Sequence, residues 1–95
     1  MAVYDTLRKA LDKFGIEHQT LMLCEECGEL IQVSNKALRY GIENERDGLI
    51  EEMADVLVII EQLRLFYDIN WLEINDIFMQ KVDRLERRLK DEKTE

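Results

Sequence analysis

Acidic side chains recur in this sequence at a spacing that could build a metal site. Glu26 and Glu29 are three residues apart, and Glu52 and Asp55 repeat that spacing further along the chain. In a helix, residues i and i+3 project from the same face, so each pair would present two carboxylates together. Carboxylates set among apolar neighbours need either a raised pKa or a cation to balance their charge. The two pairs therefore predict the binding of a divalent cation.

The two pairs are also placed to face each other across a helical hairpin. Glu29 precedes Gly41 by almost the same number of residues as Glu52 follows it. If the chain reverses at Gly41, antiparallel helices bring all four carboxylates to one level. Oxygen ligands favour Mg²⁺ first and Mn²⁺ next, whereas Zn²⁺ more often recruits histidine or cysteine. The alternative is that such pairs arise by chance on solvated helix faces, because the chain has 21 acidic residues.

The elements that would position these residues are four helices. The chain has no proline and only four glycines, which favours long, unbroken helices. Apolar residues recur at helical spacing over four segments: about 2–14, about 18–40, from Asn44 to about Phe66, and from Asn70 through Leu89. Gly15 and Gly41 are predicted to end the first two helices, and Asn44 and Asn70 to cap the other two, the last with Glu73.

The third of these helices is apolar on almost every side, which is typical of the central helix of a bundle. A chain of 95 residues has few other helices with which to surround it. We therefore expect one all-α domain over residues 1–95, a four-helix, antiparallel helical-hairpin bundle that is completed by homo-oligomerisation. The expected assembly is a homodimer or a homotetramer.

The composition excludes several classes of function. A net charge of −8 argues against a partner that is a nucleic acid polymer, because such binding needs a basic face. No apolar stretch reaches the ~18 residues of a membrane span. The first residues also lack the apolar core of a signal peptide. A cytoplasmic protein without a membrane partner is expected.

Two features near the first acid pair have a structural interpretation. Gly28 lies in mid-helix, where glycine costs about 1 kcal/mol relative to alanine, which predicts close packing or ligand access there. Cys24 and Cys27 have too few cysteine and histidine companions for a zinc site, so we expect them to pack in the core.

The acidic motifs also resemble those of a known enzyme family. The stretch EECGE, residues 25–29, followed by EMAD, residues 52–55, is similar to the EExxE…ExxD signature of the MazG-like nucleotide pyrophosphohydrolases, which are all-α NTP pyrophosphatases. The resemblance spans both central helices and continues weakly into the fourth, at FMQKVDRLERRL. It implies a homo-oligomeric enzyme that uses Mg²⁺ to hydrolyse a nucleoside triphosphate to the monophosphate and pyrophosphate, for example in the house-cleaning of (d)NTPs.

The resemblance also implies roles for individual acidic residues. The metal ligands would be Glu26, Glu29, Glu52 and Asp55. Together with Glu25 they would form the catalytic set. Glu25 lies about 100° away from Glu26 around the helix. By analogy it would orient the attacking water or help to bind a further Mg²⁺.

Three basic residues are candidates for binding the phosphates of the substrate. Lys36 lies on the same stripe as the first acid pair, two turns beyond Glu29. Lys81 and Arg84 resemble the lysine and arginine that the family has in the fourth helix. Salt bridges with neighbouring acids are the alternative for Lys81 and Arg84, since charged helices commonly form them.

Two other functions remain open from the sequence. The same superfamily includes phosphoribosyl-ATP pyrophosphohydrolases, which would keep the chemistry and change the substrate. A non-catalytic helical oligomer that binds a partner protein would explain the helices without turnover. No residue indicates which base or sugar is preferred.

Overall fold

The computed structural model describes residues 2–93, which fold into four α-helices and contain no strand. Their bounds are α1 Val3–Phe14, α2 Ile16–Tyr40, α3 Ile42–Phe66 and α4 Trp71–Lys93. The all-α class predicted from the sequence is confirmed. None of the described helices combines the length and the apolar character that crossing a membrane would require.

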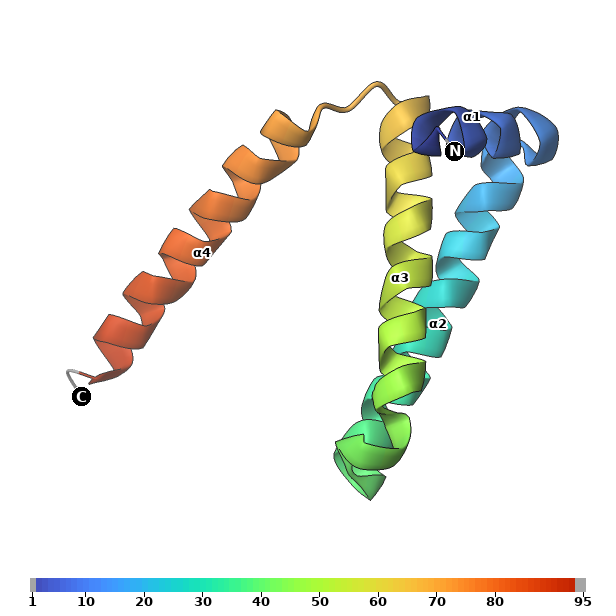
Figure 1. Ribbon diagram of the computed structural model, residues 1–95. Coiled ribbons are helices and arrows are strands. Elements are labelled where there is room, and N and C mark those ends of the chain that lie inside the picture. The colour runs from blue at the N-terminus through green and yellow to red at the C-terminus, as the bar shows by residue number, and fades with distance from the viewer. Residues whose placement is uncertain (1, 94–95) are drawn as a thin grey trace.

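Helices α2 and α3 form the long antiparallel hairpin that the sequence predicts, and α1 crosses its open end (Figure 1). The turn from α1 into α2 and the reversal from α2 into α3 each use a glycine at positive φ, where a residue with a Cβ would be strained. Gly15 has φ 86° and its N–H donates to Leu11 O at 2.8 Å. Gly41 has φ 96° and donates to Ala37 O at 3.0 Å. Each glycine therefore ends one helix and leads directly into the next.

The predicted helix starts are partly wrong. α2 begins at Ile16, and α3 begins at Ile42 rather than after Asn44, with Gly41 at its N-cap and no side-chain cap. A glycine at positive φ can reverse the chain without a loop, so no later capping residue is needed. The cap of α4 is confirmed. Asn70 Oδ1 accepts from Leu72 N–H at 2.7 Å, and Asn70 N–H donates to Glu73 Oε2 at 2.8 Å.

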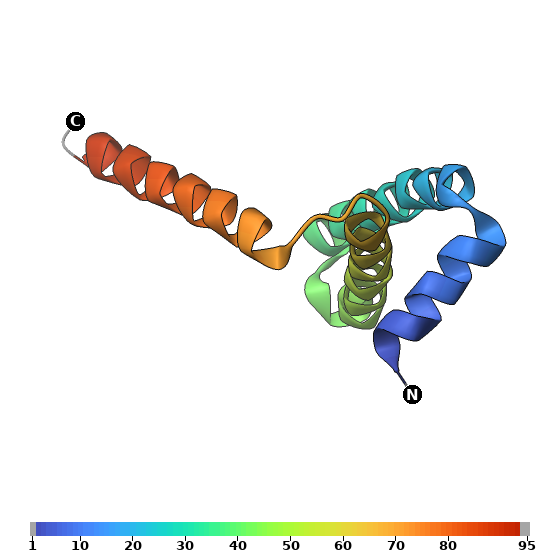
Figure 2. The same ribbon diagram turned by 90° about the horizontal axis from the view of Figure 1, so that it is seen from above.

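Helix α4 projects away from the other three and, beyond the contact of its first residue with Arg64 of α3, packs on none of them within residues 2–93 (Figures 1 and 2). The radius of gyration is 17.1 Å, whereas a compact domain of this length has about 12 Å. The stripe predicted as core is exposed except at half-buried Ile74, and comprises Trp71, Ile74, Ile77, Phe78, Val82, Leu85 and Leu89. A single chain is thus a three-helix body with a projecting fourth helix, and the predicted completion of the bundle by homo-oligomerisation stays a prediction.

The connection between α3 and α4, residues 67–70, is held by Arg64 and is called the elbow below. Arg64 Nη1 donates to Ile69 O at 2.8 Å, and Nη2 pairs with Glu61 Oε2 at 3.1 Å. The guanidinium also lies over the Trp71 ring, 5.1 Å from its centroid. Since these contacts tie the elbow and the first residue of α4 to α3, they fix the direction in which α4 leaves the hairpin.

The described chain has a small interior for its length. Among residues 2–93, the buried apolar side chains are Leu11, Val33 and Ile59. Outer residues of the hairpin such as Ile31, Leu38, Met53 and Leu57 are exposed. Cys24 is exposed too, so the prediction that it packs in the core is wrong. Apolar residues thus continue around the outside of the hairpin.

Candidate functional site

The hairpin brings three of the predicted ligands together. Glu26 of α2 and Glu52 and Asp55 of α3 each offer a carboxylate oxygen within 4.8 Å of the other two, and all three are half-buried. This group, called the carboxylate cluster below, forms because the turn at Gly41 sets the two acid pairs level, as their distances along the chain predict. Its three ligating groups are all carboxylates, which suits a hard divalent cation.

Two oxygens of the cluster have no partner. Glu26 Oε2 and Glu52 Oε2 are inaccessible to solvent and make no hydrogen bond. A buried carboxylate oxygen without a donor is costly, so such groups normally take up a proton or bind a cation. The residues present therefore fit a divalent metal ion.

The electrostatics of the carboxylate cluster also fit the binding of a divalent cation. Burial, together with the charges of Glu29 and Asp55, raises the pKa of Glu26 to about 7 from an ordinary value of 4.5. Burial and the close approach of Glu29 also raise the pKa of Glu52. Carboxyl groups that hold a proton near neutral pH can release it in exchange for a metal ion.

Glu29, the fourth predicted ligand, lies beside the cluster at the edge of an open groove of about 360 Å³. Glu52 and Lys36 line the same groove, so a basic side chain stands next to the carboxylates. Such a groove places an ammonium group where the phosphates of a metal-bound nucleotide could reach it. Gln32, Val33 and Gly48 complete the lining.

Gly48, and not Gly28, is the glycine at which the helices of this chain approach closely. A Cβ on Gly28 would meet nothing within 4 Å, so no close packing of this chain explains that glycine. A Cβ on Gly48 would come within 3.3 Å of Val33 Cγ2, because α2 and α3 approach closely beside the cluster. Gly48 and Gln32 were both missed. A glycine inside a long helix was the only available signal for Gly48, and nothing singled out Gln32.

The other predicted residues lie apart from the cluster. Glu25 is exposed on α2 and is not a member of it. Lys81 and Arg84 lie on α4, which beyond its first residue packs on neither α2 nor α3 in the described chain. The structure therefore brings Glu26, Glu52 and Asp55 together, with Glu29 and Lys36 alongside, and separates the basic residues of α4 from them.

Comparison with known proteins gives one match. A family model described as the MazG nucleotide pyrophosphohydrolase domain matches residues 14–92. The match includes both acid pairs, the groove and almost all of α4. No curated protein and no solved structure matches the chain.

Proposed function

The chain belongs to the MazG nucleotide pyrophosphohydrolase family, and from this we propose that it hydrolyses a nucleoside triphosphate to the monophosphate and pyrophosphate with Mg²⁺. The observation that carries the proposal is the pair of buried, unpartnered oxygens of Glu26 and Glu52. A cation offers them the partner that the protein itself does not supply. Members of this family act on nucleotides and generally depend on a divalent metal, which agrees with that use of the cluster.

The residues of the hairpin would have distinct roles in metal binding and phosphate binding. Glu26, Glu52 and Asp55 would hold the ion, with Glu29 beside them. When bound, Mg²⁺ supplies positive charge that offsets the phosphate oxygens and makes water a stronger nucleophile. Lys36 would donate a charge-assisted hydrogen bond to a phosphate oxygen in the groove. The reaction consumes one water, breaks the bridge between the α- and β-phosphates and releases pyrophosphate.

We propose roles for Glu25, Lys81 and Arg84 as well. Glu25, exposed beside Glu26, would orient the attacking water. Lys81 and Arg84 would bind phosphate, as the sequence resemblance implies. Because their own α4 is held away from the hairpin, they would have to do so at the cluster of another copy of the chain.

The test is a panel of nucleotides with Mg²⁺ and a readout of released pyrophosphate. The panel contains the (d)NTPs expected of a house-cleaning enzyme and also phosphoribosyl-ATP. Turnover of phosphoribosyl-ATP alone would move the chain to that second activity. No turnover of any nucleotide would favour the helical oligomer that binds a partner protein.

Two variants and a matched control assign the activity to the cluster. Glu52→Gln and Asp55→Asn should abolish Mg²⁺-dependent pyrophosphate release while the helical circular dichroism spectrum persists. Glu51→Gln removes a neighbouring exposed carboxylate that is not a member of the cluster, and should leave turnover intact. Unchanged turnover in both cluster variants would contradict the proposal.

A further inference from the structure

Helix α4 exposes an apolar stripe that no other helix of the described chain covers. Phe78 is 61% exposed, and Leu85 and Leu89 are 52% exposed. These residues recur at helical spacing on one side of a charged helix, a pattern that is typical of a face buried against another element. Within residues 2–93 no other helix packs on α4 beyond the contact of Arg64 with Trp71 at its start. The covering element must therefore come from outside this arrangement.

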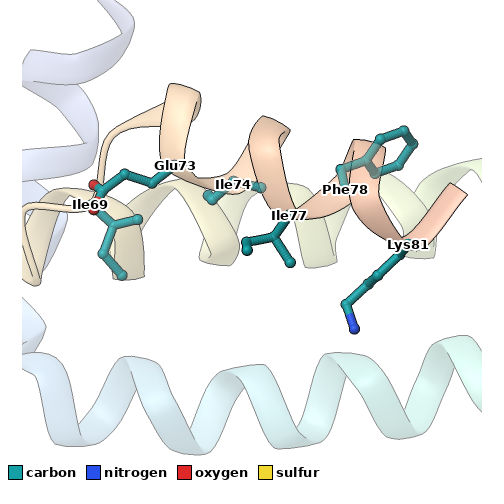
Figure 3. Close-up of a pocket in the computed structure, with 6 residues that line it drawn as sticks. All are labelled: Ile69, Glu73, Ile74, Ile77, Phe78 and Lys81. Carbon is teal, nitrogen blue, oxygen red and sulfur yellow. The ribbon is translucent and has the colours of Figure 1, made fainter. Parts of the chain in front are cut away.

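The stripe borders an open groove of about 430 Å³ at the start of α4 (Figure 3). Ile69, Ile74, Ile77 and Phe78 give it a mostly apolar lining. Figure 3 shows Ile77 and Lys81 pointing to the same side of α4, with Phe78 on the other side. The helix thus offers apolar contact around a broad arc, which suits packing against more than one helix.

The elbow keeps α4 from covering its own hairpin. For α4 to fold back, the chain would have to change direction over residues 67–70. That change would break the hydrogen bond from Arg64 to Ile69 O and the stacking of Arg64 on Trp71. Arg64 also pairs with Glu61, and its side chain is only 12% exposed. The elbow is therefore a structured connection that directs α4 outward.

The hairpin has uncovered apolar surface of its own. Leu21 and Ile31 on α2 are 70% and 61% exposed. Gly28 shares their side of the helix. A mid-helix glycine costs about 1 kcal/mol, and no atom of the same chain lies within 4 Å of its Cβ position. The close approach of a helix from another molecule would explain this glycine.

The amount of uncovered surface matches a second copy of the chain. The accessible area is 7929 Å², whereas a folded monomer of 11.3 kDa has about 5,700 Å². Two chains that each removed the excess would bury roughly 4,400 Å² in total, which is within the range of obligate homodimers. An interface of ordinary transient size would leave much of this surface exposed.

Charge and length also favour a second copy. α4 has six acidic and six basic residues, and three of the basic ones, Lys81, Arg84 and Arg88, follow one edge of it. Together α2 and α3 have eleven acidic and four basic residues. At 23 residues, α4 is about 35 Å long, and each hairpin helix of 25 residues is about 37 Å. The basic edge of α4 thus complements an acidic hairpin of matching length.

We propose that α4 is exchanged between two copies of this chain, so that each α4 packs its apolar stripe on the hairpin of the other copy. The exchange keeps the elbow as it is, covers the stripe and the outer apolar residues of the hairpin, and gives Gly28 a neighbour. Arg64, which holds the elbow from α3, then favours exchange between chains over folding back.

Isotope-mixed cross-linking tests the exchange without relying on enzyme activity. The full chain is made with photo-reactive benzoyl-phenylalanine in place of Phe78, in ¹⁴N and ¹⁵N forms that are unfolded together, refolded and irradiated. Cross-linked peptides that join α4 of one isotope to α2 or α3 of the other are expected. If every α4-to-hairpin cross-link joins peptides of a single isotope, or if mixed links join only α4 to α4, the proposal is wrong.

Light scattering supplies the second measurement, with a matched pair of variants. The wild-type chain should have twice the monomer mass of 11.3 kDa. Phe78→Asp should reduce the mass to that of one chain, because it places a charge in the covered stripe. Gln80→Asp, on the opposite side of the same turn of α4, should keep the dimer. A monomeric wild-type chain, or a Phe78→Asp variant that dimerises as well as Gln80→Asp, would overturn the proposal.

Discussion

Gln19 Nε2 donates a hydrogen bond to Gln62 Oε1 over 2.7 Å, across the interface of α2 and α3. Both residues are buried, and Gln19 Oε1 lies 2.7 Å from His18 Nδ1. The pair lies toward the open end of the hairpin, two turns from Glu26 and Asp55. Because a buried amide satisfies its hydrogen bonds in one register only, this pair helps to set the level of the carboxylate cluster.

Replacing one partner of this pair should destabilise the protein. Gln62→Ala would leave the buried amide of Gln19 without its acceptor, at a cost of about 1–3 kcal/mol. The double variant Gln19→Leu with Gln62→Leu should lose less, because no polar group is left unpaired. Urea unfolding of the wild type and the two variants measures both effects. A single variant as stable as the wild type would show that the hydrogen bond contributes nothing.

The pKa of Glu26 predicts how stability changes with pH in the absence of metal. Its folded-state pKa is about 7 and its ordinary value is 4.5. The stabilisation from this group is therefore full below pH 4.5 and is lost as the pH rises through 7. The melting temperature in EDTA should fall over that window. It should fall less in Glu26→Gln, which cannot ionise.

Adding Mg²⁺ should remove this loss of stability, because the ion binds the ionised carboxylates of the folded state. The rise in melting temperature with Mg²⁺ should thus be larger at pH 8 than at pH 5. An equal rise in melting temperature at the two pH values would show that Mg²⁺ binding does not depend on the protonation state of the carboxylate cluster.

The sequence predicted those parts of the structure that are determined by residues close to one another along the chain. The cap formed by Asn70 and Glu73 is local, and so is the reversal at Gly41, which by simple counting places Glu52 level with Glu29 and Asp55 level with Glu26. The position of α4 could not be predicted in this way. Its stripe predicts that a face is covered, but the direction in which α4 leaves the hairpin is set by the contacts of Arg64 with Ile69 and Trp71, which no periodicity reveals. Pairing of Gln19 with Gln62 is likewise a long-range contact between residue types that usually lie at the surface.

Lys36 should affect substrate binding more than metal binding. It shares the groove with Glu29 and Glu52 but offers no ligand to a cation. Lys36→Gln should raise KM roughly tenfold through the loss of one charged hydrogen bond. The Mg²⁺ concentration for half-maximal activity should change little. The control is Lys9→Gln, which replaces an exposed lysine of α1 and should leave KM unchanged. A KM in Lys36→Gln equal to that of the control would remove Lys36 from the phosphate site.

Mixed dimers can decide whether Lys81 serves the carboxylate cluster of the other copy. Glu52→Gln and Lys81→Gln should each be inactive or nearly so as pure proteins. If α4 is exchanged, a dimer of one chain of each variant has one site with both defects and one with neither. Refolding the two variants together should therefore restore turnover that neither has alone.

The control for this mixture is Glu52→Gln refolded with Asp55→Asn. Both changes damage the cluster on the chain that carries them, so every site remains defective and no turnover should return. Recovery with Lys81→Gln but not with Asp55→Asn requires that a site draw its carboxylates from one chain and its lysine from the other. If pure Lys81→Gln is inactive, equal turnover in the two mixtures would mean that Lys81 acts within its own chain.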